Sequence, residues 1–111
     1  MFRHTVLWVL LTFMTTSALA GGDPDKGKVL IKSWNCTQCH GLTGNDRSAQ
    51  EFAVPMLAGQ PAAFIVMRLK QYKSTSMEGD KSWERMTTFA QGLSETDMQD
   101  IATYYEAQKR Y

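Results

Sequence analysis

The chain has 111 residues, of which 12 are basic and 11 are acidic, so its net charge is close to zero. A chain of this length holds one domain at most. The balanced charge argues against a nucleic-acid partner, because such binding needs a basic face that neutralises phosphates.

The first twenty residues have the three-part pattern of a secretory signal peptide. A basic start with Arg3 precedes an apolar run over residues 6–14, and small and hydroxyl residues follow up to Ala20. This order predicts cleavage after Ala20 and export, which leaves residues 21–111 as the mature domain. The apolar run is shorter than the ~18–20 residues that span a bilayer, so we expect no stable membrane insertion after cleavage.

Removal of this segment changes the composition in two ways. The basic count falls from 12 to 11, which equals the acidic count, and His40 becomes the only histidine of the domain. A domain of this size buries only about 60–65% of its unfolded surface. It therefore usually needs a disulfide, a metal or a cofactor to be stable.

The first predicted helix follows Asp23 and Pro24, which have the pattern of an N-cap and a first-turn proline. Its apolar positions recur at helical spacing: Gly27, Leu30, Ile31 and Trp34. A glycine inside a helix costs about 1 kcal/mol relative to alanine. Close approach of another helix would explain Gly27, and the alternative is that Gly27 lies in a loop.

The segment WNCTQCHGLTG, residues 34–44, contains both cysteines of the chain, Cys36 and Cys39, with His40 directly after them. A disulfide between the two thiols would close a very short loop and so stabilise the fold little. A thioredoxin-like redox pair is disfavoured, because no strand-forming runs flank the motif to build a βαβ unit. A zinc site needs four ligands, and an acidic residue would have to supply the fourth.

Covalent haem attachment accounts for this motif best. In C-x-x-C-H the two thiols add to the vinyl groups of a porphyrin, and the imidazole ligates the iron from one face. The predicted export agrees, because bacteria attach haem to such motifs after export. We therefore predict one haem c, bound through Cys36 and Cys39, with His40 as an iron ligand.

A loop and two further helices are predicted after the motif. The residues between Gly41 and Gly59 are rich in loop formers, so this segment should pass over one haem edge. The middle helix opens with Pro61 and carries apolar residues at helical spacing: Phe64, Ile65, Leu69 and Tyr72. In the last helix, Ser94 and Asp97 form a capping-box pattern before a second apolar stripe: Met98, Ile101, Ala102 and Tyr105.

These features resemble the small, soluble, monohaem c-type cytochromes of bacteria, whose iron has a histidine and a methionine ligand. The resemblance covers nearly all of residues 23–108 and rests on four segments: GDPDKGKVL, CTQCHG, VPMLAGQPAAFIVMRLKQYKS and MTTFAQGLSETDMQDIATYY. It implies an all-α cytochrome c fold, in which three to four helices wrap around one haem and a loop supplies the axial methionine. It also implies that the terminal helices cross, so we expect Gly27 to face Tyr104 and Tyr105.

The resemblance further implies two site residues beyond the motif. Pro55 matches a proline whose carbonyl accepts a hydrogen bond from the ligand imidazole, which fixes the ring and raises its basicity. The family's methionine ligand lies seven residues before the leucine of L-S-x-x-D, and counting back from Leu93 gives Met86. Met77 is the rival ligand in the same loop. The other methionines of the domain are assigned to packing: Met98 in the core, and Met56 and Met67 in the haem pocket.

One segment departs from the family pattern. Relatives follow the middle helix with a short G-x-R turn whose arginine lies near a haem propionate, whereas this chain has KSTSMEGDKSWERM. Arg85 or Trp83 could take over that contact, or the segment could simply be a solvated loop.

The resemblance and the motif together predict a periplasmic electron carrier rather than an enzyme. Iron held by His40 and Met86 has no open position for a substrate, and no second set of catalytic groups is visible. The expected partners are redox proteins that a monomeric carrier meets transiently, with Thr37 and Gln38 at the docking edge or as mere spacers.

Two alternatives stay open at this stage. The chain could be a haem subunit of a periplasmic oxidoreductase complex. It could also be a ligand-binding or peroxidatic haem protein if Met86 does not bind iron, and a thiol-redox role is the weakest candidate.

Overall fold

The computed structural model of this protein describes residues 21–47 and 53–111. The predicted signal peptide over residues 1–20 lies outside the described residues. Within those two ranges, no helix is long and apolar enough to cross a membrane.

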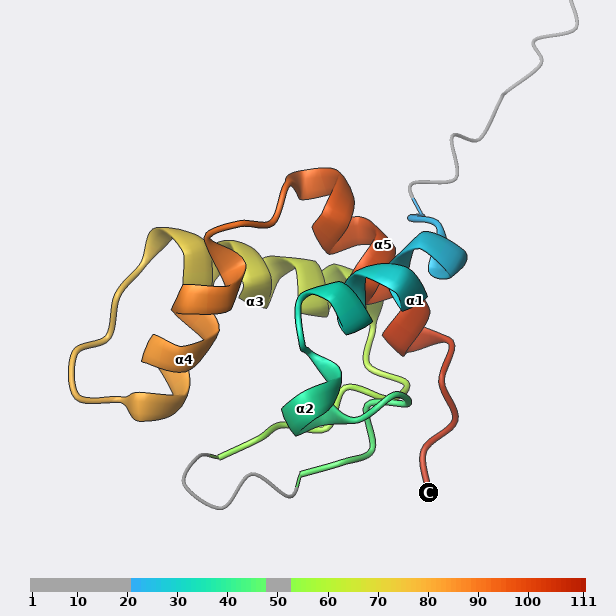
Figure 1. Cartoon of the computed structure of the whole chain (residues 1–111), viewed down its shortest axis with the longest axis horizontal. Helices are drawn as coiled ribbons and strands as arrows, with labels where there is room; N and C mark the ends of the chain where they lie inside the picture. The colour runs from blue at the N-terminus through green and yellow to red at the C-terminus, as the bar shows by residue number, and fades with distance from the viewer. Residues whose placement is uncertain (1–20, 48–52) are drawn as a thin grey trace, which may run out of the picture.

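The described residues form helices and no strands, which confirms the predicted all-α class. Residues 21–47 and 53–111 contain five helices rather than three to four, and one of them is a single turn. Figure 1 shows their arrangement, with bounds as follows: α1 Pro24–Ser33, α2 Thr37–His40, α3 Ala62–Ser74, α4 Lys81–Ala90 and α5 Glu95–Glu106.

The terminal helices α1 and α5 pack against each other, as predicted (Figure 1). Gly27 is buried at their contact, where an added Cβ atom would lie 2.1 Å from the Asp100 carbonyl oxygen and 2.9 Å from Cβ of Tyr104. Gly27 therefore faces the predicted region, and the backbone of Asp100 makes the closest approach. Any side chain at this position would force the two helices apart.

Both terminal helices begin as the sequence predicts. The Asp23 carboxylate accepts hydrogen bonds from the backbone N–H groups of Asp25 and Lys26. Ser94 and Asp97 form a reciprocal capping box at the start of α5. These caps satisfy N–H groups that have no partner inside a helix.

The core lies between α5, α1 and α3. The predicted stripe of α5 is buried, including Met98 at 2% exposure, which confirms Met98 as a core residue. Ile31 from α1 and Ile65 and Leu69 from α3 join the same cluster. The α3 helix begins at Ala62 directly after Pro61, as predicted.

Met86 does not lie in the loop that the resemblance implied, although residues 75–80 before it are not helical. Residues 81–90 form α4, whose N-cap Asp80 accepts a hydrogen bond from the backbone N–H of Trp83. Trp83, Met86 and Phe89 recur every three residues, so they fall on adjoining positions of one side of the helix. Met86 is therefore carried by a helix.

Candidate haem site

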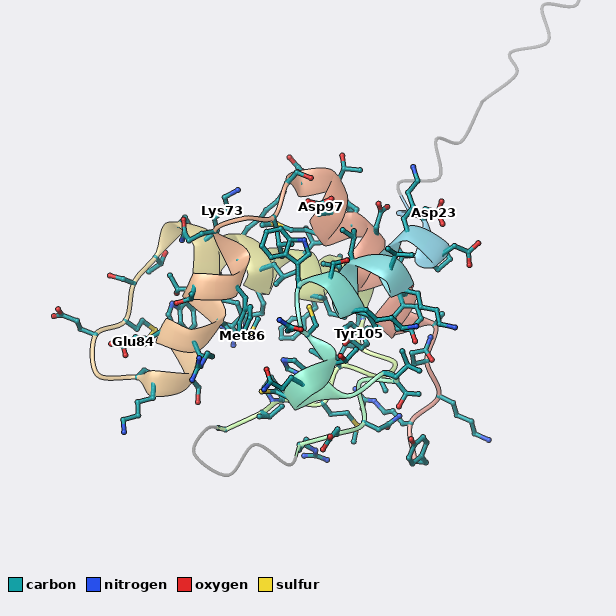
Figure 2. All side chains as sticks on the ribbon, in the orientation of Figure 1. Asp23, Lys73, Glu84, Met86, Asp97 and Tyr105 are labelled. Atoms are coloured by element: carbon teal, nitrogen blue, oxygen red, sulfur yellow. The ribbon has the colours of Figure 1, made fainter. Side chains whose placement is uncertain are left out.

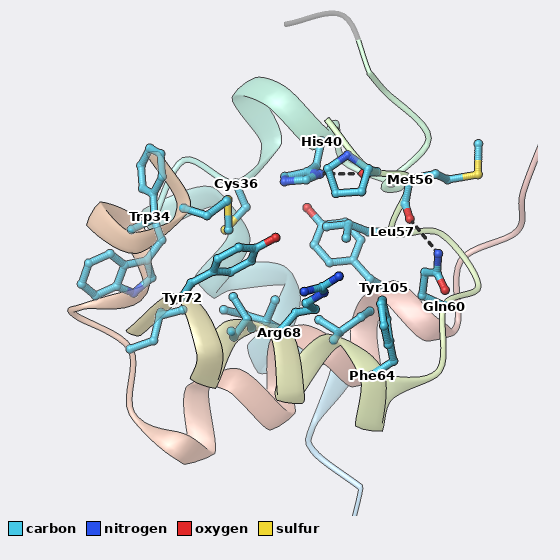
Figure 3. A pocket seen from close by; sticks show the side chains of 17 residues that line it. Trp34, Cys36, His40, Met56, Leu57, Gln60, Phe64, Arg68, Tyr72 and Tyr105 are labelled. Carbon is cyan, nitrogen blue, oxygen red and sulfur yellow. Dashed lines mark hydrogen bonds between the residues drawn. The ribbon is translucent and has the colours of Figure 1, made fainter. Parts of the chain in front are cut away.

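Two adjoining cavities lie among α2, α3, α4 and the loop that precedes α3. The larger encloses about 240 Å³ and the smaller about 50 Å³. Residues from three separate segments line both of them: Cys36, His40, Pro55, Met86 and Phe89. Figure 2 shows Met86 on α4 and Tyr105 on α5, and Figure 3 shows the larger cavity from close by.

The lining of the larger cavity is mostly aliphatic and aromatic. Apart from the tyrosine hydroxyls, the Trp34 indole and the Cys36 thiol, its polar side chains are His40, Gln60 and Arg68. Such a lining suits a large, flat, apolar group that needs a few oriented polar contacts.

The backbone around the cysteine motif turns sharply twice. Asn35, with φ of 58°, separates α1 from α2, and asparagine tolerates this left-handed conformation better than most residues. Gly41, with φ of 75°, ends α2 directly after His40, where its own N–H bonds the Thr37 carbonyl oxygen. These two turns confine Cys36, Cys39 and His40 to one short helical turn beside the cavities.

His40 is buried and held by its Nδ1 atom, which lies 3.2 Å from the Pro55 carbonyl oxygen (Figure 3). A carbonyl only accepts, so the proton of this bond is on Nδ1, and Nε2 of the neutral ring keeps its lone pair. Burial lowers the pKa of His40, although the Pro55 hydrogen bond and the charge of Asp46 oppose the shift. The ring is thus neutral near pH 7, as an iron ligand must be. The predicted contact between Pro55 and the imidazole is present.

The two thiols differ in their surroundings. Both are free and half-buried, and Cys36 lines both cavities whereas Cys39 lines only the smaller. Burial raises the pKa of Cys36 to about 11, so this thiol is a poor thiolate donor for a metal or for disulfide exchange. Among the described residues, no three His, Cys, Asp or Glu side chains are arranged to hold a metal ion. The zinc and thiol-redox interpretations therefore lose support.

The methionines differ in whether they line the two cavities. Met86 lines both, and Met56 lines the larger, as expected for a pocket residue. Met77 is 45% exposed in the turn before α4 and lines neither. Met67 is also 45% exposed, on the outer side of α3, so its assignment to the haem pocket is wrong. The helical rotation between Met67 and Leu69 turns Met67 outward.

A cationic residue that sequence reasoning missed lies at the larger cavity. The Arg68 side chain reaches into it from α3 (Figure 3), with its guanidinium carbon 5.7 Å from the centre of the Phe64 ring. Arg68 comes four residues after Phe64 and four before Tyr72, so the helical spacing could have revealed it.

Of the two residues predicted as possible contacts of a haem propionate, only Arg85 lines a cavity that also borders the cysteine motif, whereas Trp83 lines neither cavity. The indole N–H of Trp83 donates to the Thr75 carbonyl oxygen at 2.7 Å, so it is already used within the protein. Arg85 lines the smaller cavity, beside Cys39 and Ser82.

Comparison with known proteins identifies the family. Residues 24–108 match the family described as Cytochrome c. The chain belongs to the cytochrome c family. Membership of this family implies a covalently bound haem c.

Individual relatives cover the chain to different extents. Cytochrome c-554(548) of Halomonas halodenitrificans is 36% identical over 88 residues, which are 79% of this chain and 99% of the relative. Cytochrome c4 of Stutzerimonas stutzeri is 36% identical over 109 residues, which are 91% of this chain and 49% of the relative. The crystal structure of reduced recombinant cytochrome c4 from Pseudomonas stutzeri superimposes with a TM-score of 0.66 and 30% identity, over 82% of this chain and 48% of that one. The chain thus spans about half the length of the cytochrome c4 relatives.

The described residues fit a haem c in these cavities. A thiol and a neutral imidazole face the larger cavity, a second thiol borders the smaller, and most of the lining is apolar. Cys36, Cys39 and His40 come from one turn of chain, as C-x-x-C-H attachment requires.

Proposed function

We propose that this protein is a periplasmic, monohaem electron carrier whose iron is ligated by His40 and Met86. The observation that supports it most is that Met86 and His40, 46 positions apart in the sequence, line the same two cavities. When bound, the haem supplies one-electron chemistry between ferric and ferrous iron. Export of the chain after cleavage at Ala20 and action as a monomer are parts of this proposal.

The residues around the site favour a carrier over an enzyme. Met86 offers a thioether from α4, and iron held by a histidine and a methionine would favour the ferrous state and would have no position left for a substrate. Burial of His40 and the apolar lining exclude water, which disfavours the extra charge of the ferric state. Thr37 and Gln38 lie in α2 between the two cysteines, where a redox partner would approach the thioether edge.

The experiment that tests this proposal is optical and magnetic spectroscopy of the haem-loaded protein and its Met86→Ala variant. We expect the parent to be low-spin in both oxidation states and indifferent to carbon monoxide. We expect Met86→Ala to become high-spin and to bind carbon monoxide, because the cavity side of α4 then offers no ligand. Met77→Ala is the matched control and should behave like the parent.

Other outcomes would contradict the proposal in distinct ways. A high-spin parent that binds carbon monoxide would show that Met86 does not ligate iron, and would favour ligand binding or peroxide chemistry. A change in Met77→Ala but not in Met86→Ala would move the ligand to Met77. Purification of the native protein only within a larger complex would favour an oxidoreductase subunit.

A further inference from the structure

Tyr105 lies where α5 meets the site. Its side chain is fully buried and lines the larger cavity. Figure 3 shows its hydroxyl turned toward the side of the cavity where His40 lies. Burial raises the pKa of Tyr105 well above its usual value, so the hydroxyl stays protonated and can donate a hydrogen bond.

Tyr105 contacts two chain segments: the segment that follows His40 and the segment that carries Pro55, whose carbonyl bonds the imidazole. Its hydroxyl donates to the carbonyl oxygen of Gly41, the residue after His40, at 3.2 Å. Its backbone carbonyl accepts from the N–H of Gly59 at 3.0 Å, in the segment that carries Pro55. Its ring also borders Gly44, where an added Cβ atom would lie 2.8 Å from the ring.

A backbone hydrogen bond connects these two segments to each other beside Tyr105. The Gly44 carbonyl accepts the N–H of Leu57 at 2.9 Å. The bond between His40 and Pro55 spans the same two segments. The position of the imidazole relative to the Pro55 carbonyl therefore depends on how α5 holds the chain on both sides.

The neighbouring tyrosine offers an internal comparison. The Tyr104 hydroxyl donates to the Leu42 carbonyl oxygen at 2.6 Å, one residue further from His40. Tyr104 lines neither haem cavity. The two rings pack edge to face with centres 5.4 Å apart. They therefore make similar bonds from the same helix, and only Tyr105 borders the site.

We propose that Tyr105 is a positioning residue, which keeps the His40 imidazole hydrogen-bonded to Pro55 and thereby tunes the ferric–ferrous equilibrium. This inference rests on the proposed function. A firm Nδ1–H···O bond makes the imidazole more basic and so a better donor to ferric iron. Loss of the Tyr105 hydroxyl frees the Gly41 carbonyl, weakens the Nδ1 bond and shifts the equilibrium toward ferrous iron.

The test compares Tyr105→Phe with Tyr104→Phe in the haem-loaded protein. We measure the reduction potential and, by NMR, the chemical shift and solvent exchange of the His40 Nδ1 proton. For Tyr105→Phe we expect a shift of up to about tenfold toward the ferrous form, which is about 59 mV for a one-electron couple. The Nδ1 proton should also exchange faster. We expect Tyr104→Phe to leave both readouts at the parent values.

The outcomes separate a positioning role from a merely structural one. If both variants lower the denaturation midpoint but leave the potential and the Nδ1 proton unchanged, the inference is overturned. Equal potential shifts in both variants would also overturn it, because the effect would then belong to α5 as a whole. Replacement of Tyr105 by 3-fluorotyrosine keeps the packing and strengthens the donor, so we expect a shift of opposite sign, and no shift would count against the role. A high-spin parent spectrum would instead defeat the proposed function.

Discussion

The α1–α5 crossing and the α4 helix differ in how much of their surface other protein residues bury. Of its twelve residues α5 buries six, whereas α4, with ten residues, buries only Ala90. At the crossing, Gly27 brings two backbones into direct contact, and protein atoms fill the interface. On α4, the inward residues Met86 and Phe89 face the cavities instead. One region is thus completed by the chain alone, and the other is shaped for the haem.

The attachments of α4 agree with this difference. It is tied to the end of α3 by hydrogen bonds near its two ends. The Trp83 indole N–H donates to the Thr75 carbonyl at 2.7 Å, and the Gln91 amide donates to the Lys73 carbonyl at 3.0 Å. The Trp83 ring also packs edge to face on Tyr72, with centres 4.6 Å apart. Hence α4 is held by hydrogen bonds near its two ends, and the stability of its middle turns depends on the group that fills the cavity.

The largest expected effect comes from preventing haem attachment. In the double variant Cys36→Ser, Cys39→Ser, we expect the opening free energy of α4 to fall close to zero, because its inward face loses its contacts. Helices α1 and α5 should keep measurable protection. Amide hydrogen exchange by NMR or mass spectrometry checks this, with Thr37→Ser as a control that keeps both thiols. Equal loss of amide protection in α4 and α5 would contradict the proposal that only α4 depends on the haem.

The crossing should be far more sensitive to added volume than to lost charge. We expect Gly27→Ala to destabilise the protein by about 3 kcal/mol, because the new methyl meets the Asp100 backbone, which yields little. Chemical denaturation monitored by circular dichroism measures this loss. The exposed neighbour Lys28→Ala should stay within about 0.5 kcal/mol of the parent. A neutral or stabilising Gly27→Ala would mean that the two helices separate easily.

The smallest effect should come from the exposed ion pair between α3 and α5. The Lys70 ammonium lies 2.8 Å from the Glu95 carboxylate, and its hydrogen bond lowers the pKa of Glu95. The pair's contribution is therefore present at neutral pH and is lost as the pH falls below the ordinary glutamate value of 4.5. We expect Glu95→Gln to change the denaturation midpoint only slightly at pH 7, since solvent screens the pair, and less as the pH falls through the lowered pKa of Glu95. A large difference at pH 7 would show that the α3–α5 contact depends on charge.

The sequence predicted the frame of the fold well because its signals are local. The caps at Asp23 and Ser94 and the apolar stripe of α5 depend on spacing along one helix, and each is present. Gly27 was predicted at a helix crossing because an unfavourable residue on an apolar stripe needs a reason. The structure adds that the closest neighbour is the Asp100 backbone, which no side-chain pattern reports.

The expectations that failed concern segments whose role depends on neighbours. The resemblance predicts a loop around Met86, although Trp83, Met86 and Phe89 have the spacing of one helix side. The chemistry of Met67 suits packing in the pocket, but its position on α3 turns it outward. Arg68 was missed for the converse reason, since a charged residue is not expected to face an apolar cavity.

The sequence by itself determined the chemistry of this protein: C-x-x-C-H with a single histidine in residues 21–111 specifies covalent haem, because those groups must be adjacent in the chain. The family resemblance also implied Pro55 and Met86, but only the tertiary structure shows how these distant groups and Tyr105 are placed around the motif. Pro55 reaches Nδ1 of His40, Met86 lines the same cavities from α4, and Tyr105 ties both flanking segments to α5. The physical reason is that a covalent motif is defined by spacing along the chain. The groups around a ligand are brought together by packing over long sequence separations, and local pattern does not encode their distances.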